Sequence, residues 1–200
     1  MDKIEPYRTI IPLPKIEGEA DDEENSNEKT NFINFDTKTI VLFGTIDNII
    51  ASKISDCIEV LAVEADAPLT VKINSTGGML ESVQSIITEL NRYSGDINID
   101  IVGCAYSGAG MIALSGDHII MSELGSFMIH YPKWSTNEQN LNEYKRDTAA
   151  TEEYFNRMMQ MLLKGTKYSF ARFKKDTGTK GDLYFTPKEC LKYGFVHEVY

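Results

Sequence analysis

Histidine, cysteine and long apolar runs are all scarce in this 200-residue sequence, and each scarcity excludes a class of protein. The three histidines, His118, His130 and His197, are far apart and include no His-x-x-x-His pair, so a metal site is not expected. Three cysteines without close spacing make neither a disulfide framework nor a zinc cluster, which favours a reducing compartment. No apolar run approaches the roughly 18 residues of a membrane span, and no signal-peptide stretch precedes the N-terminal prolines. We therefore expect a cytoplasmic protein with no membrane segment.

Basic residues are also few, with 20 Lys and Arg against 30 Asp and Glu, for a formal net charge of −10. A negative surface repels phosphates, so binding to nucleic acid or to an anionic membrane is disfavoured. Much of the excess negative charge lies in one place, because the segment from Ile16 to Glu28 has seven acidic residues and no basic residue. The rest of the chain is only mildly acidic.

The length suits one domain of ordinary size, and 42% hydrophobic residues are enough for a core. Residues 1–35 contain the acidic run and lack sustained periodicity, so we predict a flexible acidic N-terminal arm. Residues 36–200 are predicted to form the folded domain. Its apolar patterns alternate between strands such as LTVKIN and helical stripes such as Leu80, Val83, Ile87 and Leu90. Strands that alternate with helices indicate an α/β fold with parallel strands.

Three features where predicted strands end could carry chemistry. The turn INSTGG has two glycines before a helix, so its backbone N–H groups could hold an anion or an oxyanion, although a plain turn would look the same. Ser107 in GCAYSGAG has room for a substrate carbonyl, or is simply a helix cap in a tight turn. His130 in SFMIHYP is a candidate base or an ordinary strand-end histidine. Together they supply the oxyanion donors, nucleophile and base of acyl transfer.

From about Thr37 to Tyr200 the sequence resembles the Clp protease proteolytic subunit (ClpP) family, within the ClpP/crotonase superfamily. The resemblance rests on FGTID, INSTGG, GCAYSGAG, MIHYP, and KKDT followed by YFTPKECLKYGFVHEV, all in the family's order. It implies a ClpP/crotonase-like fold of repeated β-β-α turns with a projecting long helix.

By the same resemblance, the nucleophile falls on Ser107, the general base on His130 and the acid on Asp176. The segment from Asp176 to Pro187 is one residue longer than usual in the family, so Asp182 stays open as an alternative acid. The oxyanion donors fall on the backbone N–H groups of Gly78 and Gly108.

The resemblance implies a serine endopeptidase that cleaves unfolded proteins or peptides and needs neither a metal nor an organic cofactor. It further implies a homo-oligomer, a seven-membered ring or stacked rings around a chamber, fed by an AAA+ ATPase unfoldase. The alternatives are a catalytically silent ring subunit or adaptor, and a crotonase-like enzyme acting on acyl-thioesters. Within the protease class, a specialised maturation protease, for example one acting on a viral capsid protein, is a further alternative.

The sequence departs from the family pattern at several places. Thr76 replaces a proline, and Gly108 stands where the family usually has methionine. After Pro132 the chain has KWSTNEQN instead of a glycine-rich strand that pairs with substrate and helps to join two rings. Thr70 and Lys72 occupy positions where the family often has aromatic residues that line a docking cleft for the unfoldase.

Overall fold

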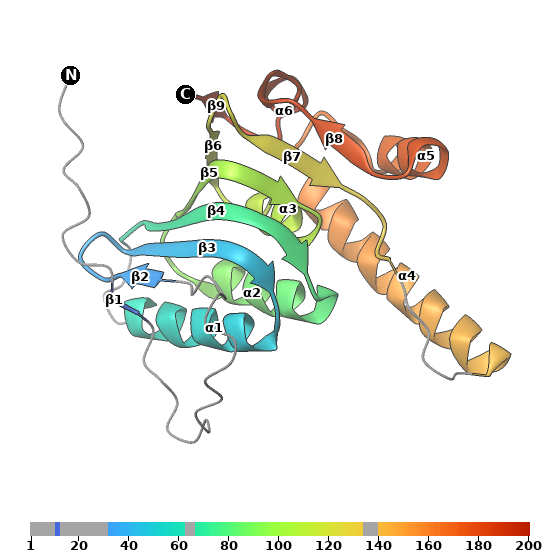
Figure 1. Cartoon of the computed structure of the whole chain (residues 1–200), viewed down its shortest axis with the longest axis horizontal. Coiled ribbons are helices and arrows are strands. Elements are labelled where there is room, and N and C mark those ends of the chain that lie inside the picture. Colours follow the sequence, from blue (N-terminus) through green and yellow to red (C-terminus); the bar gives the residue numbers. More distant parts are fainter. Residues whose placement is uncertain (1–10, 13–31, 63–66, 134–139) are drawn as a thin grey trace, which may run out of the picture.

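The computed structural model describes residues 11–12, 32–62, 67–133 and 140–200 (Figure 1). They form a nine-stranded mixed sheet with helices packed against it. The strands are β1 (Ile11–Pro12), β2 (Phe32–Asn34), β3 (Thr39–Ile46), β4 (Leu69–Gly78), β5 (Ile97–Tyr106), β6 (His118–Met121), β7 (Ser126–Ile129), β8 (Leu183–Phe185) and β9 (Glu198–Val199). The helices are α1 (Asn48–Ala62), α2 (Leu80–Arg92), α3 (Gly108–Ala113), α4 (Leu141–Leu163), α5 (Phe170–Lys180) and α6 (Pro187–Tyr193).

The centre of the sheet consists of the parallel strands β3, β4 and β5, which are joined through α1 and α2. In each strand alternate side chains are buried, and Leu42, Ile73 and Ile101 are wholly inaccessible to solvent. Helices α1 and α2 lie side by side on one face of these strands and supply apolar side chains to the same core (Figure 1). Parallel strands direct their carboxyl ends to one edge of the sheet, so the turns after β3, β4 and β5 meet there.

Strand β5 pairs with two successive partners along its length. Its first half pairs with β6, and its last residues, from Cys104 to Tyr106, pair with β7 in the parallel sense. Strand β8 then adds to β7 in the antiparallel sense, with Ile129 opposite Leu183. This order brings the end of β7, the end of β5 and the start of β8 to one place.

Helix α4 is the longest helix of the described chain, and its first half extends away from the sheet (Figure 1). Its buried residues all lie in the second half, from Phe155 to Leu163. Among the described residues, no helix is both long enough and apolar enough to cross a bilayer.

The predicted α/β architecture, with parallel strands and a projecting long helix, is confirmed. The predicted boundary at residue 35 differs from the structure, because β2 pairs with β3 and Ile33 is buried. Residues 11–12 add to the edge of β2, whereas residues 1–10 and 13–31, which include the acidic run, lie outside the described residues. The backbone of the sheet therefore includes at least two short stretches of the predicted arm.

Candidate active site

Ser107 connects the end of β5 to the start of α3, and its backbone is held in a rare conformation. Its φ of 54° and ψ of −121° lie in a region that residues with a Cβ seldom adopt, at a cost of about 1–3 kcal/mol. The N–H of Ser107 donates a hydrogen bond to the carbonyl of Met128 at 2.8 Å, which ties this turn to β7. A strained strand-to-helix turn of this kind presents a serine hydroxyl away from the backbone, as a nucleophile requires.

His130 directly follows β7 and faces Ser107. Its Nε2 lies 2.7 Å from the Ser107 Oγ, and its Nδ1 lies 3.1 Å from Oδ1 of Asp182. With the proton on Nδ1, the imidazole donates to the carboxylate and accepts from the serine hydroxyl, because Asp182 can only accept when ionised. The three side chains thus form a continuous chain of hydrogen bonds from Ser107 through His130 to Asp182.

The position of Asp182 follows from strand register. Because Ile129 is opposite Leu183 in the antiparallel pair, the next residues along, His130 and Asp182, are also brought together. The other oxygen of the carboxylate, Oδ2, accepts a hydrogen bond from Nζ of Lys133 at 3.1 Å.

The electrostatics of this group suit a base that is neutral and an acid that is ionised near neutral pH. Burial lowers the pKa of His130 below its ordinary value, and Asp182 opposes this effect in part. The hydrogen bond from Lys133 lowers the pKa of Asp182, with a further contribution from His130. His130 is therefore able to accept a proton from Ser107 while Asp182 remains charged.

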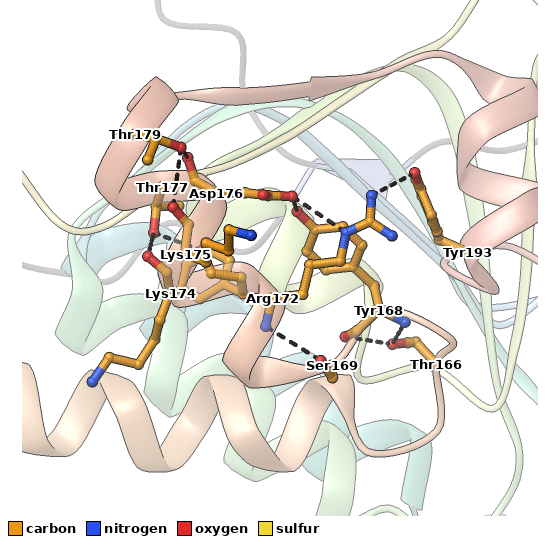
Figure 2. A network of polar contacts seen from close by, with 11 residues as sticks. Thr166, Tyr168, Ser169, Arg172, Lys174, Lys175, Asp176, Thr177, Thr179 and Tyr193 are labelled. Atoms are coloured by element: carbon orange, nitrogen blue, oxygen red, sulfur yellow. Dashed lines mark hydrogen bonds and ion pairs between the residues drawn. The ribbon is translucent and has the colours of Figure 1, made fainter.

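Asp176, which the sequence predicts as the acid, does not contact His130 in the structure. It lies within α5, where its Oδ2 accepts hydrogen bonds from the Tyr168 hydroxyl at 2.5 Å and from Arg172 Nε at 3.3 Å (Figure 2). Arg172 also donates to the Tyr193 hydroxyl and stacks over both tyrosine rings. These donors lower the pKa of Asp176, the Tyr168 hydroxyl most of all.

Asp182 contacts His130 in place of Asp176 for a local physical reason. Helix α5 continues through KKDTGTK as far as Lys180 and so keeps Asp176 away from β7. Thr177 supports the helix by hydrogen bonding back to the carbonyl of Phe173. The chain leaves the helix only at Gly181, whose φ of 75° suits glycine, so Asp182 is the acid that reaches β7.

The glycine turn after β4 lies directly against Ser107. Gly77 has a φ of 91°, and a Cβ at this position would lie 2.8 Å from the Gly108 nitrogen and 2.9 Å from the Ser107 Cβ. The Ser75 hydroxyl, which sequence reasoning did not select, accepts a hydrogen bond from the Gly77 N–H and so braces the turn. The close approach places the backbone of Gly77, the residue before Gly78, beside Ser107 and Gly108.

A cavity of about 370 Å³ opens next to this turn. It is lined by residues from the start of α2, from the segment after β7 and from α4: Gly78, Met79, Leu80, Glu81, Pro132, Lys133 and Thr151. The cavity therefore reaches one of the two glycines that the sequence predicts as oxyanion donors. Within the described ranges, no cluster of three or more His, Cys, Asp or Glu side chains could hold a metal ion.

Comparisons with known proteins identify the family and the fold of this chain. The family model for Clp protease matches residues 22–200. The ATP-dependent Clp protease proteolytic subunit 2 of Gluconobacter oxydans is 23% identical over 195 residues, which cover 93% of this chain and 85% of the relative. The ATP-dependent Clp protease proteolytic subunit of Streptococcus pneumoniae is 24% identical over 169 residues, which cover 81% of this chain and 84% of the relative.

Among solved structures, a ClpP1 variant from Listeria monocytogenes superimposes with a TM-score of 0.71 at 23% identity. The match covers 83% of this chain and 92% of that one, so it supports the fold over most of both molecules.

Proposed function

Because the chain belongs to the Clp protease family, we propose that it is a serine endopeptidase that cleaves peptide bonds through Ser107, His130 and Asp182. The observation that carries this proposal is the 2.7 Å contact between the His130 Nε2 and the Ser107 Oγ. A base within hydrogen-bond distance of a hydroxyl, itself oriented by a carboxylate, is the arrangement that activates a serine.

In the proposed reaction, His130 takes the proton of the Ser107 hydroxyl as the oxygen attacks the carbonyl carbon of the peptide. The oxyanion that forms accepts hydrogen bonds from the backbone N–H groups of Gly78 and Gly108. Gly108 is the first residue of α3, and an N–H in the first turn has no partner within its own helix.

His130 next gives its proton to the nitrogen of the departing amine, which leaves an ester between Ser107 and the substrate. Water then loses a proton to His130 and attacks the ester, and the protonated His130 returns that proton to the Ser107 oxygen. Asp182 remains ionised and stabilises the charged imidazole at both stages.

We further propose that the protein works as a homo-oligomer in the cytoplasm, with an ATPase that delivers unfolded polypeptides. The relatives are named as subunits of ATP-dependent Clp proteases. In this chain, large apolar side chains on α4 are exposed, including Leu141 at 65% and Met161 at 53%. Exposed apolar side chains on a projecting helix favour contact between copies of the chain.

The proposal is tested by incubating the protein with a fluorophosphonate probe and mapping the labelled peptide. We expect label on Ser107, and we expect Ser107→Ala to lower peptide hydrolysis by about 10⁴-fold or more while leaving assembly intact. A Ser107→Ala protein with a tenth or more of the original activity would exclude the serine protease. If the unaltered protein is not labelled and cleaves no peptide, the silent-subunit alternative is favoured. An acyl-thioesterase activity that survives Ser107→Ala would favour the crotonase-like alternative.

A further inference from the structure

Lys133 lies three residues after His130 and contacts the same carboxylate. Its Nζ is 3.1 Å from Oδ2 of Asp182, while Oδ1 of that carboxylate is 3.1 Å from Nδ1 of His130. Each oxygen of Asp182 therefore has its own donor. The intervening Pro132 restricts the backbone between the two donors, because its ring fixes φ.

We propose that Lys133 is a positioning residue of the active site, which holds the Asp182 carboxylate so that Oδ1 faces the imidazole of His130. This inference rests on the proposed function. The terminal torsion of an aspartate side chain has a broad energy profile, so one hydrogen bond leaves the carboxylate free to turn. A second donor on the other oxygen restricts that rotation. Asp182 is 32% exposed, so water competes for its oxygens unless both have protein donors.

The charge of Lys133 acts on both partners. The lysine lowers the pKa of Asp182, chiefly through its hydrogen bond, and its charge contributes to the lowered pKa of His130. Removing the lysine is therefore expected to raise the pKa of both groups. A more basic imidazole by itself would be a stronger base, so a lower kcat above neutral pH reports lost orientation and not lost charge.

Other charged side chains lie near Asp182. Asp182 lines a polar cavity of about 170 Å³ together with Arg172, Asp176, Lys180 and Glu189. Arg172 and Asp176 pair with each other, Lys180 acts on Asp176, and Glu189 caps α6 through the backbone and hydroxyl of Thr186. Lys133 lies outside this cavity, and its ammonium group contacts Asp182 directly.

The exposure of the Lys133 side chain limits how much kcat should fall when the lysine is removed. The Lys133 side chain is 75% exposed, and exposed ion pairs are weak and screened by salt. We expect Lys133→Gln to lower kcat for a short peptide about two- to fivefold near pH 8, with KM unchanged. Lys133→Arg should restore kcat, and the difference between the original protein and Lys133→Gln should shrink as salt rises.

A matched control is Lys188→Gln, which removes the same charge from an exposed position on α6. It should leave kcat, KM and their salt dependence as they are in the original protein. A kcat that is unchanged in Lys133→Gln, or a loss that Lys133→Arg does not restore, would overturn the positioning role. A change confined to KM would also overturn it, since Lys133 would then contact substrate in the adjoining cavity.

A second measurement does not depend on activity. NMR titration of the His130 imidazole in the Ser107→Ala background should show a higher pKa when Lys133→Gln is added, and no change when Lys188→Gln is added. An unmoved His130 pKa in Lys133→Gln would overturn the proposed contact even if the protein cleaves no peptide. Absence of Ser107 labelling would instead count against the proposed function, so the two failures are distinguishable.

Discussion

The hydrogen bonds around His130 assign different roles to two aspartates only six positions apart. Asp182 contacts the imidazole, whereas Asp176 is held by Tyr168 and Arg172 on α5. The carboxylate of Asp176 is held by its tyrosine and arginine partners within the packing of α5, whereas the carboxylate of Asp182 contacts the imidazole and is the acid of the proposed reaction. Substitution by asparagine separates the two roles, because it keeps the shape and removes the charge.

Asp182→Asn should therefore lower kcat by about 10²- to 10⁴-fold, because the amide no longer stabilises the charged imidazole or holds its tautomer. Asp176→Asn should lower the melting temperature through weaker contacts with Tyr168 and Arg172, with kcat little changed. The measurements are peptide hydrolysis and thermal unfolding of both variants. If Asp176→Asn lowers kcat strongly and Asp182→Asn does not, the catalytic acid is Asp176, as the sequence first suggested.

The lowered pKa of His130 predicts the acid side of the pH profile. Catalysis needs the neutral imidazole, so kcat/KM should be level above the His130 pKa and fall about tenfold per pH unit below it. Since burial lowers that pKa, the midpoint should lie below the ordinary value of about 6.5. The measurement is kcat/KM of a short peptide between about pH 4.5 and 9. A midpoint above 6.5 would show that the attraction of Asp182 outweighs the effect of burial on the pKa of His130.

The lowered pKa of His130 also makes the stability of the fold depend on pH. The unfolded state, in which His130 has its ordinary pKa, binds the proton first as the pH falls. The contribution of His130 to stability is therefore intact above about pH 6.5 and decreases below it.

At the scale of secondary structure, the site depends on the ends of β4, β5 and β7, which meet at one edge of the sheet. The turn after β4 approaches Ser107 so closely that a side chain at Gly77 has no room. A Cβ there would lie 2.7 Å from the carbonyl oxygen of Tyr106, and the φ of 91° is unfavourable for any residue with a Cβ.

Gly77→Ala should therefore lower stability by about 1–3 kcal/mol and should also lower kcat, because the strand end and Ser107 must move apart. The matched control is Gly165→Ala, where a Cβ would meet nothing within 4 Å. Urea unfolding and peptide hydrolysis of both variants test the prediction. Equal stability of the two alanine variants would show that the turn is looser than its contacts indicate.

At the scale of the whole molecule, the two halves of helix α4 differ in burial. Phe155, Met159 and Leu163 anchor its second half in the core, and the first half extends away from the sheet (Figure 1). The exposed Leu141 is at the tip of this projection, in the first turn of the helix. This arrangement suits a helix that contacts another copy of the chain.

Leu141→Asp should accordingly lower the mass of the assembly measured by analytical ultracentrifugation. Because an acid in the first turn stabilises a helix, the substitution should weaken the contact between copies of the chain without destabilising α4. Asn142→Asp adds the same charge at the neighbouring exposed position and should leave the assembly intact. An unchanged mass for Leu141→Asp would exclude the tip of α4 from the interface.

The sequence by itself determined the alternation of strands and helices and indicated Ser107 and His130 as candidate site residues. Each stands in a short local pattern at the end of a predicted strand, and their contact in the structure follows from neighbouring parallel strands. The partner of His130 could not be chosen in the same way, because two aspartates were available within one segment. The choice depends on how far α5 continues and on which residues of β7 and β8 face each other.

Lys133 was visible in the sequence only as part of a segment that departs from the family pattern. Its contact with Asp182 joins residues 49 positions apart. The contact depends on the pairing of β7 with β8, which cannot be recognised from neighbouring residues in the sequence. Helix propensities and strand patterns act over a few neighbouring residues, whereas side-chain pairing across a sheet depends on register. Tertiary structure therefore decided which carboxylate contacts His130, the second donor to that carboxylate and the hydrogen bonds of Ser75, because these depend on contacts between separate elements.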